Sequence, residues 1–292
     1  MHALLAYPLY LFLTYLAIMV STFSIHVFIP TSPPILGFIA RCMSAYLSLI
    51  ACAIYGTIAC TILRIFNLHY KYGQWTTAKA FKHVCKHTIG VTFKILDDGD
   101  RILNAKRPYV IVANHQTELD ILLLGAIWPQ HCSVTSKKSL QKIPFLGWFM
   151  TLSGAVFIDR VDRNQAMKAF EGAATAMKEL GQSVLIFPEG TRSYPKQPML
   201  LPFKKGAFHL AVQAGVDVLP VVAEHYGRVL DVKALKFNGG TVRVKVLEPI
   251  STKGLTADDV TELCEGTRNK MLDAIEKMAR DPESRSDAKK GQ

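Results

Sequence analysis

The sequence predicts an α/β protein in which a mixed sheet is flanked by helices and preceded by an N-terminal membrane helical hairpin. Three observations predict this class. The chain has 292 residues, enough for a complete α/β core with an appended segment. Its first 40 residues contain no Asp, Glu, Lys or Arg. Short apolar strands then alternate with amphipathic helices, as at 109–113, 164–180 and 183–187.

Charge is unevenly distributed along the chain. The formal net charge of +11 arises entirely outside the uncharged first 40 residues, and the mean hydropathy is positive. A basic surface beside an apolar N-terminus favours anionic lipid headgroups or phosphorylated substrates. Nucleic acid is the other common partner of basic proteins. It is disfavoured because the sequence lacks zinc-finger spacing and an aromatic RNA-binding box.

Two apolar segments form the predicted hairpin, the first at about 4–29 and the second at about 35–65. Each exceeds the roughly 20 residues that span a bilayer core. Pro30, Pro33 and Pro34 break the helix between them. A cleavable signal peptide is disfavoured, since the first segment has no basic n-region and no small-residue cleavage site.

Basic residues follow the second segment. Arg64 and the lysines between positions 71 and 86 place the rest of the chain in the cytosol by the positive-inside rule. The same pattern also fits a hairpin that enters only one leaflet. The expected divisions are membrane helices at 1–69, an interfacial connector at 70–105, an α/β catalytic domain at 106–250, a C-terminal helix at 251–280 and a disordered basic tail at 281–292.

The six cysteines show no Cys-x-x-Cys motif and no Cys/His ligand spacing. We therefore expect no metal site and no redox site. Buried or lipid-facing free thiols are the expected state.

The stretch VIVANHQTELD at 110–120 carries the strongest chemical signal. A strand ends just before His115, and an apolar helical pattern begins at Thr117. Asp120 stands at the capping-box position of that helix. The same carboxylate can also accept a hydrogen bond from His115 Nδ1 and leave the other ring nitrogen free as a base. Five positions along a helix turn two side chains about 140° apart, so the pair can meet only if His115 precedes the helix.

A second strand, at 183–187, is followed by a polar turn at 188–192. Gly190 allows close backbone approach, and Thr191 and Arg192 offer hydrogen-bond donors to a phosphate. Taken alone, a Pro-Glu-Gly turn of this kind is more often structural than functional.

Four blocks make the chain resemble the glycerolipid acyltransferase family. They are NHQTELD at 114–120, KKSLQKIPFLGWFMTLSGAVFIDR at 137–160, FPEGTRS at 187–193 and LPFKKGAFHLAVQAGVDVLPVV at 201–222. The Gln after the histidine, the FIDR ending and EGTRS resemble the 1-acylglycerol-3-phosphate O-acyltransferase (lysophosphatidic acid acyltransferase) branch. The resemblance implies transfer of an acyl group from acyl-CoA to the free hydroxyl of lysophosphatidic acid, giving phosphatidic acid in phospholipid biosynthesis.

The resemblance also implies site residues. The catalytic pair would be His115, as the base, and Asp120, which orients it. The implied substrate-binding residues are Lys137, Arg160, Glu189, Gly190, Thr191 and Arg192. Glu189 would either engage a hydroxyl or brace Arg192, and without the resemblance Lys137 and Arg160 are solvated charges. Because no G-x-S-x-G elbow or catalytic-cysteine signature is present, direct transfer from acyl-CoA as co-substrate is expected, with no metal and no separate cofactor.

The remaining blocks carry weaker expectations. Residues 143–149, IPFLGWF, fit either core or a contact with an acyl chain. Asp217 stands where the family usually has proline, and His209 is expected in the core. Further along, a strand at 241–247 and a helix at 257–278 complete the predicted fold.

The C-terminal Lys289-Lys290 resembles a retrieval signal of endoplasmic-reticulum membrane proteins. We therefore expect an integral membrane protein of that compartment, with its catalytic domain and C-terminus on the cytosolic side and the lipid bilayer as a partner. Two alternatives stay open. The chain can instead acylate glycerol-3-phosphate or another lysophospholipid, or be a non-catalytic lipid-binding membrane protein.

Overall fold

A computed structural model describes residues 2–105, 108–159 and 162–281 of the chain. Arg160 lies outside the described residues, as does the tail from residue 282 with its Lys289-Lys290 pair.

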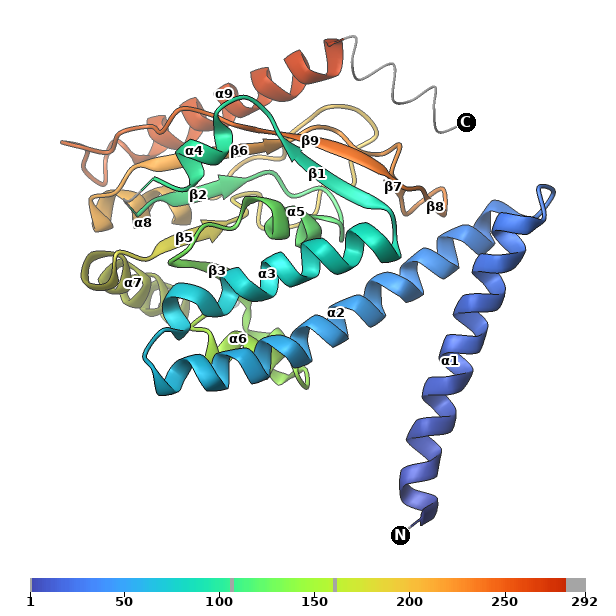
Figure 1. Ribbon diagram of the computed structural model, residues 1–292. Coiled ribbons are helices and arrows are strands. Elements are labelled where there is room, and N and C mark those ends of the chain that lie inside the picture. Colours follow the sequence, from blue (N-terminus) through green and yellow to red (C-terminus); the bar gives the residue numbers. More distant parts are fainter. Residues whose placement is uncertain (1, 106–107, 160–161, 282–292) are drawn as a thin grey trace.

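A mixed β-sheet forms the centre of the protein (Figure 1). Within the described residues it has seven strands, in the order β1-β9-β6-β2-β5-β3-β4. The strands are β1 (Val91–Ile95), β2 (Val110–Ala113), β3 (Cys132–Lys137), β4 (Val156–Ile158), β5 (Ser183–Ile186), β6 (Val218–Ala223) and β9 (Gly240–Val246). Neighbouring strands run parallel except β6 and β9, which are antiparallel. The predicted class, a mixed sheet flanked by helices, is confirmed.

Helices cover both faces of the sheet (Figure 1). On one face lie α3 (His69–Thr88) and α5 (Asp120–Ile127), and on the other lie α7 (Arg163–Leu180), α8 (Gly206–Ala214) and α9 (Val260–Arg280). The remaining elements are the short helix α4 (Gly99–Leu103), the 3-10 helix η1 (Lys138–Lys142), α6 (Leu146–Leu152) and the small hairpin of β7 (Leu230–Asp231) and β8 (Lys236–Phe237).

Two hydrophobic layers hold these elements together, because successive side chains of a strand point to opposite faces. Ile111 and Ala113 of β2 pack toward α3 and α5, whereas Val110 and Val112 pack toward the opposite layer of helices. All four are fully buried. A strand covered on both faces reads as a continuous apolar run, which is why β2 was recognisable from sequence.

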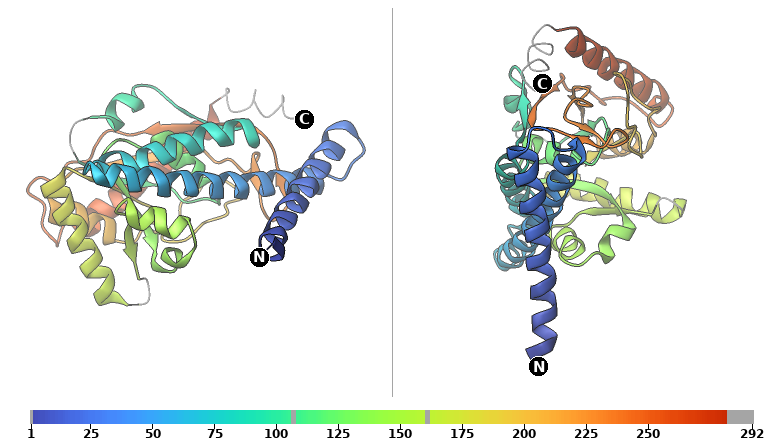
Figure 2. Two further views of the ribbon diagram at one scale, coloured as in Figure 1. Left: turned by 60° about the horizontal axis from the view of Figure 1, so that its bottom comes forward. Right: turned by 90° about the vertical axis from the view of Figure 1, so that its right-hand side faces the viewer.

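The N-terminal hairpin consists of α1 (His2–Phe28) and α2 (Pro34–Ile65). Among the described residues, these two helices are long and apolar enough to cross a membrane by length and composition. Figure 2 shows α1 projecting away from the rest of the protein, while α2 lies along α3. Arg41, which interrupts the second apolar segment, donates hydrogen bonds to Ile89 O at 3.4 Å and Phe237 O at 3.3 Å. The first turns of α2 are therefore tied to the α/β core.

The segment expected as a connector, 70–105, contributes more structure than the sequence indicated. Its first part forms α3, which packs against α2 and α5, and Val91–Ile95 form the edge strand β1. The strand was missed because only five residues, VTFKI, carry it and two of them are polar. Helix α3, which was interpreted as an interfacial segment, also contributes Phe81 and Cys85 to the core.

Two local expectations differ from the structure. The side chain of His209 was expected in the core, but it is exposed on α8 between the buried Phe208 and Leu210. The last helix begins at Val260 instead of residue 257, because the Asp259 carboxylate accepts hydrogen bonds from Thr256 and holds the residues before it in a turn.

Candidate active site

The site forms where three parallel strands end. Strands β2, β5 and β3 are neighbours in the sheet and run in the same direction, so their carboxyl ends meet at one edge. His115 follows β2, the turn 188–192 follows β5, and Lys137 is the last residue of β3. Topology thus brings together residues that are separated by up to 77 positions in the sequence, from 115 to 192.

His115 and Asp120 form a hydrogen-bonded pair. The distance from His115 Nδ1 to Asp120 Oδ2 is 2.7 Å, and the Asp120 side chain is buried. Helix α5 begins at Asp120, so His115 lies before the helix, as the pairing requires. The same Oδ2 also accepts the backbone N–H groups of Gln116 at 2.6 Å and Thr117 at 3.0 Å. Asp120 therefore both fixes the backbone of the loop before α5 and holds the histidine.

The loop that carries His115 is fixed to the end of β6. Asn114 pairs with the backbone of Ala223 through both its Oδ1 and its Nδ2, at 2.9 and 3.0 Å. Gln116 Nε2 donates to Glu224 O at 2.9 Å. Both side chains are buried, and their bonds hold the loop in place at the residues directly before and after His115. Stacking on Phe187, with ring centroids 4.3 Å apart, sets the plane of the His115 ring.

Glu189 supports the backbone of His115. Its Oε1 accepts the His115 N–H at 2.7 Å, and its Oε2 accepts the Leu201 N–H at 3.0 Å. Its side chain is buried, and burial raises the pKa of this carboxyl above its ordinary value, while the two N–H donors oppose the shift. Both roles expected for Glu189, contact with a hydroxyl or a brace for Arg192, differ from these contacts.

Arg192 is braced by Glu118 instead. Glu118 Oε1 accepts hydrogen bonds from Arg192 Nη1 at 3.0 Å and from the Tyr194 hydroxyl at 2.6 Å. The arginine and the glutamate are each about two-fifths exposed. A guanidinium group has five N–H donors in a fixed fork, so one ion pair leaves other donors for an anion.

The turn before Arg192 requires glycine. Gly190 has φ of +71°, in the left-handed region that favours glycine. A Cβ at this position would also come within 2.7 Å of Lys204 Cε. The turn therefore brings Thr191 and Arg192 past His115 in a conformation that other residues would strain.

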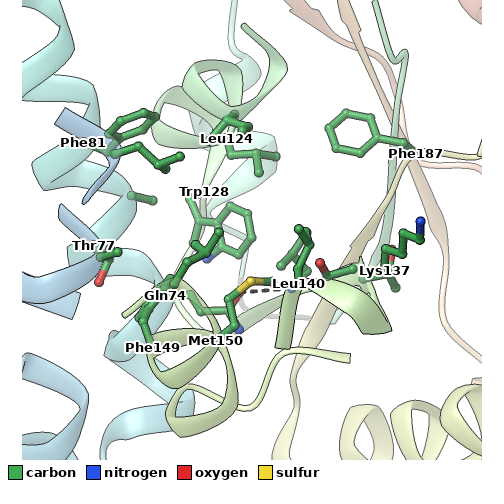
Figure 3. A pocket seen from close by; sticks show the side chains of 18 of the residues that line it. Gln74, Thr77, Phe81, Leu124, Trp128, Lys137, Leu140, Phe149, Met150 and Phe187 are labelled. Carbon is green, nitrogen blue, oxygen red and sulfur yellow. Dashed lines mark hydrogen bonds between the residues drawn. The ribbon is translucent and has the colours of Figure 1, made fainter. Parts of the chain in front are cut away.

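A cavity of about 520 Å³ opens beside His115. One end of the cavity is polar. It is lined by His115, Lys137, Thr191, Arg192 and Tyr194. The rest is mostly apolar and extends between α2, α3, α5 and α6. Figure 3 shows Phe81, Leu124, Trp128, Phe149 and Met150 around this part, with Lys137 and Phe187 on the opposite side.

The stretch 143–149 is divided between the cavity and the surface of the protein. Leu146 and Phe149 line the cavity, whereas Ile143, Phe145 and Trp148 are exposed. The exposed side chains continue the apolar surface of the neighbouring α2, against which α6 packs.

Most of the predicted site residues therefore gather around one cavity. His115, Lys137, Thr191 and Arg192 line it, Asp120 and Glu189 lie behind the histidine, and Gly190 shapes the turn. Arg160 lies outside the described residues. Sequence reasoning missed Glu118, Tyr194 and Tyr226. Glu118 stands inside the first block, so its position gave a signal. The two tyrosines lie outside that block and reach its residues only through the fold.

This geometry is suited to proton transfer at a polar group of a ligand whose apolar part occupies the cavity. In the tautomer with hydrogen on Nδ1, the carboxylate holds the ring and Nε2 presents a lone pair. Such an imidazole can remove a proton from a hydroxyl group. Among the described residues, no group of three or more His, Cys, Asp or Glu side chains is placed to hold a metal ion.

Comparison with known proteins identifies relatives. A family model described as Acyltransferase matches residues 94–224. The 1-acyl-sn-glycerol-3-phosphate acyltransferase of Saccharomyces cerevisiae is 41% identical over 242 residues, which cover 83% of this chain and 78% of that protein. The human 1-acyl-sn-glycerol-3-phosphate acyltransferase alpha is 34% identical over 81% of this chain and 78% of its own length.

A solved structure has the same fold. The crystal structure of the 1-acyl-sn-glycerophosphate (LPA) acyltransferase from Thermotoga maritima aligns with a TM-score of 0.59 and 22% identity, covering 78% of this chain and 96% of that one.

Proposed function

We propose that this chain transfers an acyl group from acyl-CoA to the free hydroxyl of 1-acyl-sn-glycerol-3-phosphate. The chain belongs to the acyltransferase family and to its 1-acylglycerol-3-phosphate O-acyltransferase branch. The product is phosphatidic acid, made in phospholipid biosynthesis. The reaction uses acyl-CoA as co-substrate and no separate cofactor.

The observation that carries this proposal is the His115–Asp120 pair at the polar end of an apolar cavity. His115 Nε2 removes the proton of the acceptor hydroxyl, whose oxygen attacks the thioester carbonyl carbon. The carbon–sulfur bond then breaks, and the imidazolium returns its proton to the CoA thiolate as it leaves. Asp120 stabilises the imidazolium between these steps.

The cavity matches the apolar part of such substrates. Acyl chains have no polar groups to satisfy, and the walls formed by α2, α3, α5 and α6 are mostly apolar. Gln74 is a polar residue of that wall, and its side-chain amide is hydrogen-bonded to other groups of the protein. It donates to Ser153 O at 3.3 Å and accepts from Val134 N at 3.1 Å. An acyl chain can therefore lie against it without leaving a polar atom unpaired.

The polar end of the cavity matches the phosphate. Lys137 and Arg192 supply positive charge there, and Thr191 adds a hydroxyl donor. Arg160 is proposed as a further phosphate contact on the family resemblance alone. In this scheme Gly190 shapes the turn, and Glu189 acts by holding the His115 backbone.

The apolar hairpin supports a location of this site at a membrane. Helices α1 and α2 carry the large exposed apolar side chains expected of a surface in contact with lipid. We propose an endoplasmic-reticulum membrane protein with the catalytic domain on the cytosolic side. A membrane location brings the lysolipid to the cavity, which α2 and α6 help to line.

The proposed function is tested by product analysis. The purified full-length chain, in nanodiscs, is given an acyl-CoA mixture with lysophosphatidic acid, glycerol-3-phosphate or another lysophospholipid. We expect phosphatidic acid and free CoA in equal amounts, with the highest kcat/KM for lysophosphatidic acid. Preferred acylation of another acceptor would contradict the proposed acceptor. Lysolipid binding without release of CoA would favour the non-catalytic alternative.

Replacing Arg192 by alanine is expected to raise the KM for lysophosphatidic acid about tenfold, with smaller changes in kcat and in the KM for acyl-CoA. Hydrogen bonds to a charged group are worth about 1.5–3 kcal/mol, and the partial exposure of Arg192 places the effect at the lower end. Steady-state kinetics at varied acceptor concentration provide the measurement. Arg101→Ala, which removes an exposed arginine paired with Asp98, is the matched control. An unchanged acceptor KM would exclude Arg192 from phosphate binding.

A further inference from the structure

Tyr226 lies behind the catalytic pair. It follows β6, 106 positions after Asp120, and its hydroxyl donates to Asp120 Oδ1 at 2.5 Å. Both side chains are essentially inaccessible to solvent, with exposed fractions of 0% and 1%. A buried tyrosine hydroxyl needs a hydrogen-bond partner, and here that partner is the carboxylate that holds His115.

The bond completes the hydrogen bonding of the carboxylate. Oδ2 accepts three donors, namely His115 Nδ1 and the N–H groups of Gln116 and Thr117. Oδ1 accepts from Tyr226. Because Oδ2 is engaged by the histidine and the backbone, the tyrosine is the group that satisfies the second oxygen. Without it, a buried charged oxygen would lack this donor, which is costly in a region from which water is excluded.

The position of Tyr226 is itself fixed by the fold. Its ring packs edge-on against Phe93 of β1, with centroids 6.4 Å apart and planes at 85°. Its carbonyl accepts the N–H groups of Val229 at 2.8 Å and Leu230 at 3.1 Å, which closes the turn after β6. The hydroxyl also accepts the Thr117 N–H at 3.2 Å. A tyrosine held in this way at its ring and at its backbone keeps its hydroxyl aimed at Asp120.

Tyr226 keeps its proton across the pH range in which the enzyme works. Burial, together with the charge of Asp120, holds the pKa of Tyr226 well above its ordinary value of 10.0. The hydroxyl is therefore a permanent donor. The charge of Asp120 also acts on Glu189 and Arg192, and raises the pKa of each.

We propose that Tyr226 is a positioning residue for acyl transfer: its hydroxyl keeps the Asp120 carboxylate oriented toward His115. This inference rests on the proposed function, since it assumes that His115 acts as the base. A carboxylate that loses a donated hydrogen bond attracts a proton more strongly. The paired imidazole then gives its proton back less readily. Removal of the hydroxyl is expected to slow the chemical step without weakening substrate binding.

The test is Tyr226→Phe in the full-length protein. We expect kcat to fall about tenfold or more, the effect of losing one hydrogen bond to a charged group, with both KM values unchanged. The acid limb of the kcat/KM profile should move to higher pH, because the proton that inactivates the base is held more tightly. Tyr109→Phe, at another fully buried tyrosine, is the matched control and should keep both kcat and the pH profile.

A double substitution separates positioning from packing. If Tyr226 acts through the charge of Asp120, Tyr226→Phe should cost much less kcat in an Asp120→Asn background than in the wild type. Equal losses in both backgrounds would overturn the proposal, as would an unchanged kcat in the single variant. Rates are expressed per folded molecule, from melting curves of each variant. A wild-type protein without acyl transfer would instead overturn the proposed function, and this inference with it.

Discussion

Acyl transfer by the His115→Ala variant is expected to be about 10³-fold slower than by the wild type. General base catalysis contributes about 10²–10⁴-fold, and His115 is the histidine that meets both the cavity and a carboxylate. The protein should still fold, because His115 contributes to the hold on this loop mainly through its own backbone. The His115 N–H donates to Glu189 and its carbonyl accepts from Ser193, and alanine keeps both. Release of CoA at saturating substrates measures the loss.

A matched histidine provides the control. His209 is exposed on α8, so His209→Ala should keep the wild-type rate and melting temperature. The substitution also shows whether loss of any imidazole affects the assay. If His115→Ala retained a tenth or more of the wild-type kcat, the base assignment would be wrong.

Local patterns predicted the elements that carry the site. Strands β2 and β5 are fully buried and, apart from Ser183, apolar, and both end in polar turns that the sequence marks clearly. Helix α7 shows the expected amphipathic pattern, with the Asp162 side chain at its N-terminus and Gly181 in the left-handed conformation at its end. Such signals depend on a few neighbouring residues, so they can be read without knowing the fold.

Contacts between distant segments could not be predicted in this way. Tyr226 reaches Asp120 only because β6 lies beside β2 in the sheet, and the sequence gives no register for that pairing. The partner of Arg192 also depends on the fold, and bracing this arginine was one of the two roles expected for Glu189. Glu189 is its near neighbour in sequence, but the turn directs that carboxylate to the backbone, and Glu118 from the first block pairs with the arginine.

Helical period explains a smaller error. His209 was assigned to the core because its neighbours are apolar. In α8 the buried positions are Ala207, Phe208, Leu210, Ala211 and Ala214, which form one side of the helix. Position 209 lies between them in sequence, yet faces outward. A window of only nine residues with many apolar positions does not fix which side is buried.

The Asp120→Asn variant is expected to lose up to about 10³-fold in kcat, no more than the His115→Ala variant, because the carboxylate acts only through the histidine. Asparagine keeps the shape. Its oxygen, placed as Oδ2, can still accept from His115 and from the two backbone N–H groups, and its NH₂ group can donate to the Tyr226 hydroxyl. The folded structure should therefore survive while the charge that stabilises an imidazolium is removed.

Comparison with Asp120→Ala separates the two roles that one oxygen performs. Alanine leaves the N–H groups of Gln116 and Thr117 without their shared acceptor, so the unfolding free energy should fall by about 1–3 kcal/mol. Asparagine should stay close to the wild type in melting temperature. If the asparagine variant were destabilised as much as the alanine variant, its low rate would reflect lost structure. A stable but inactive Asp120→Asn would instead show that the histidine requires the negative charge, in addition to the hydrogen bonds that hold the loop before α5.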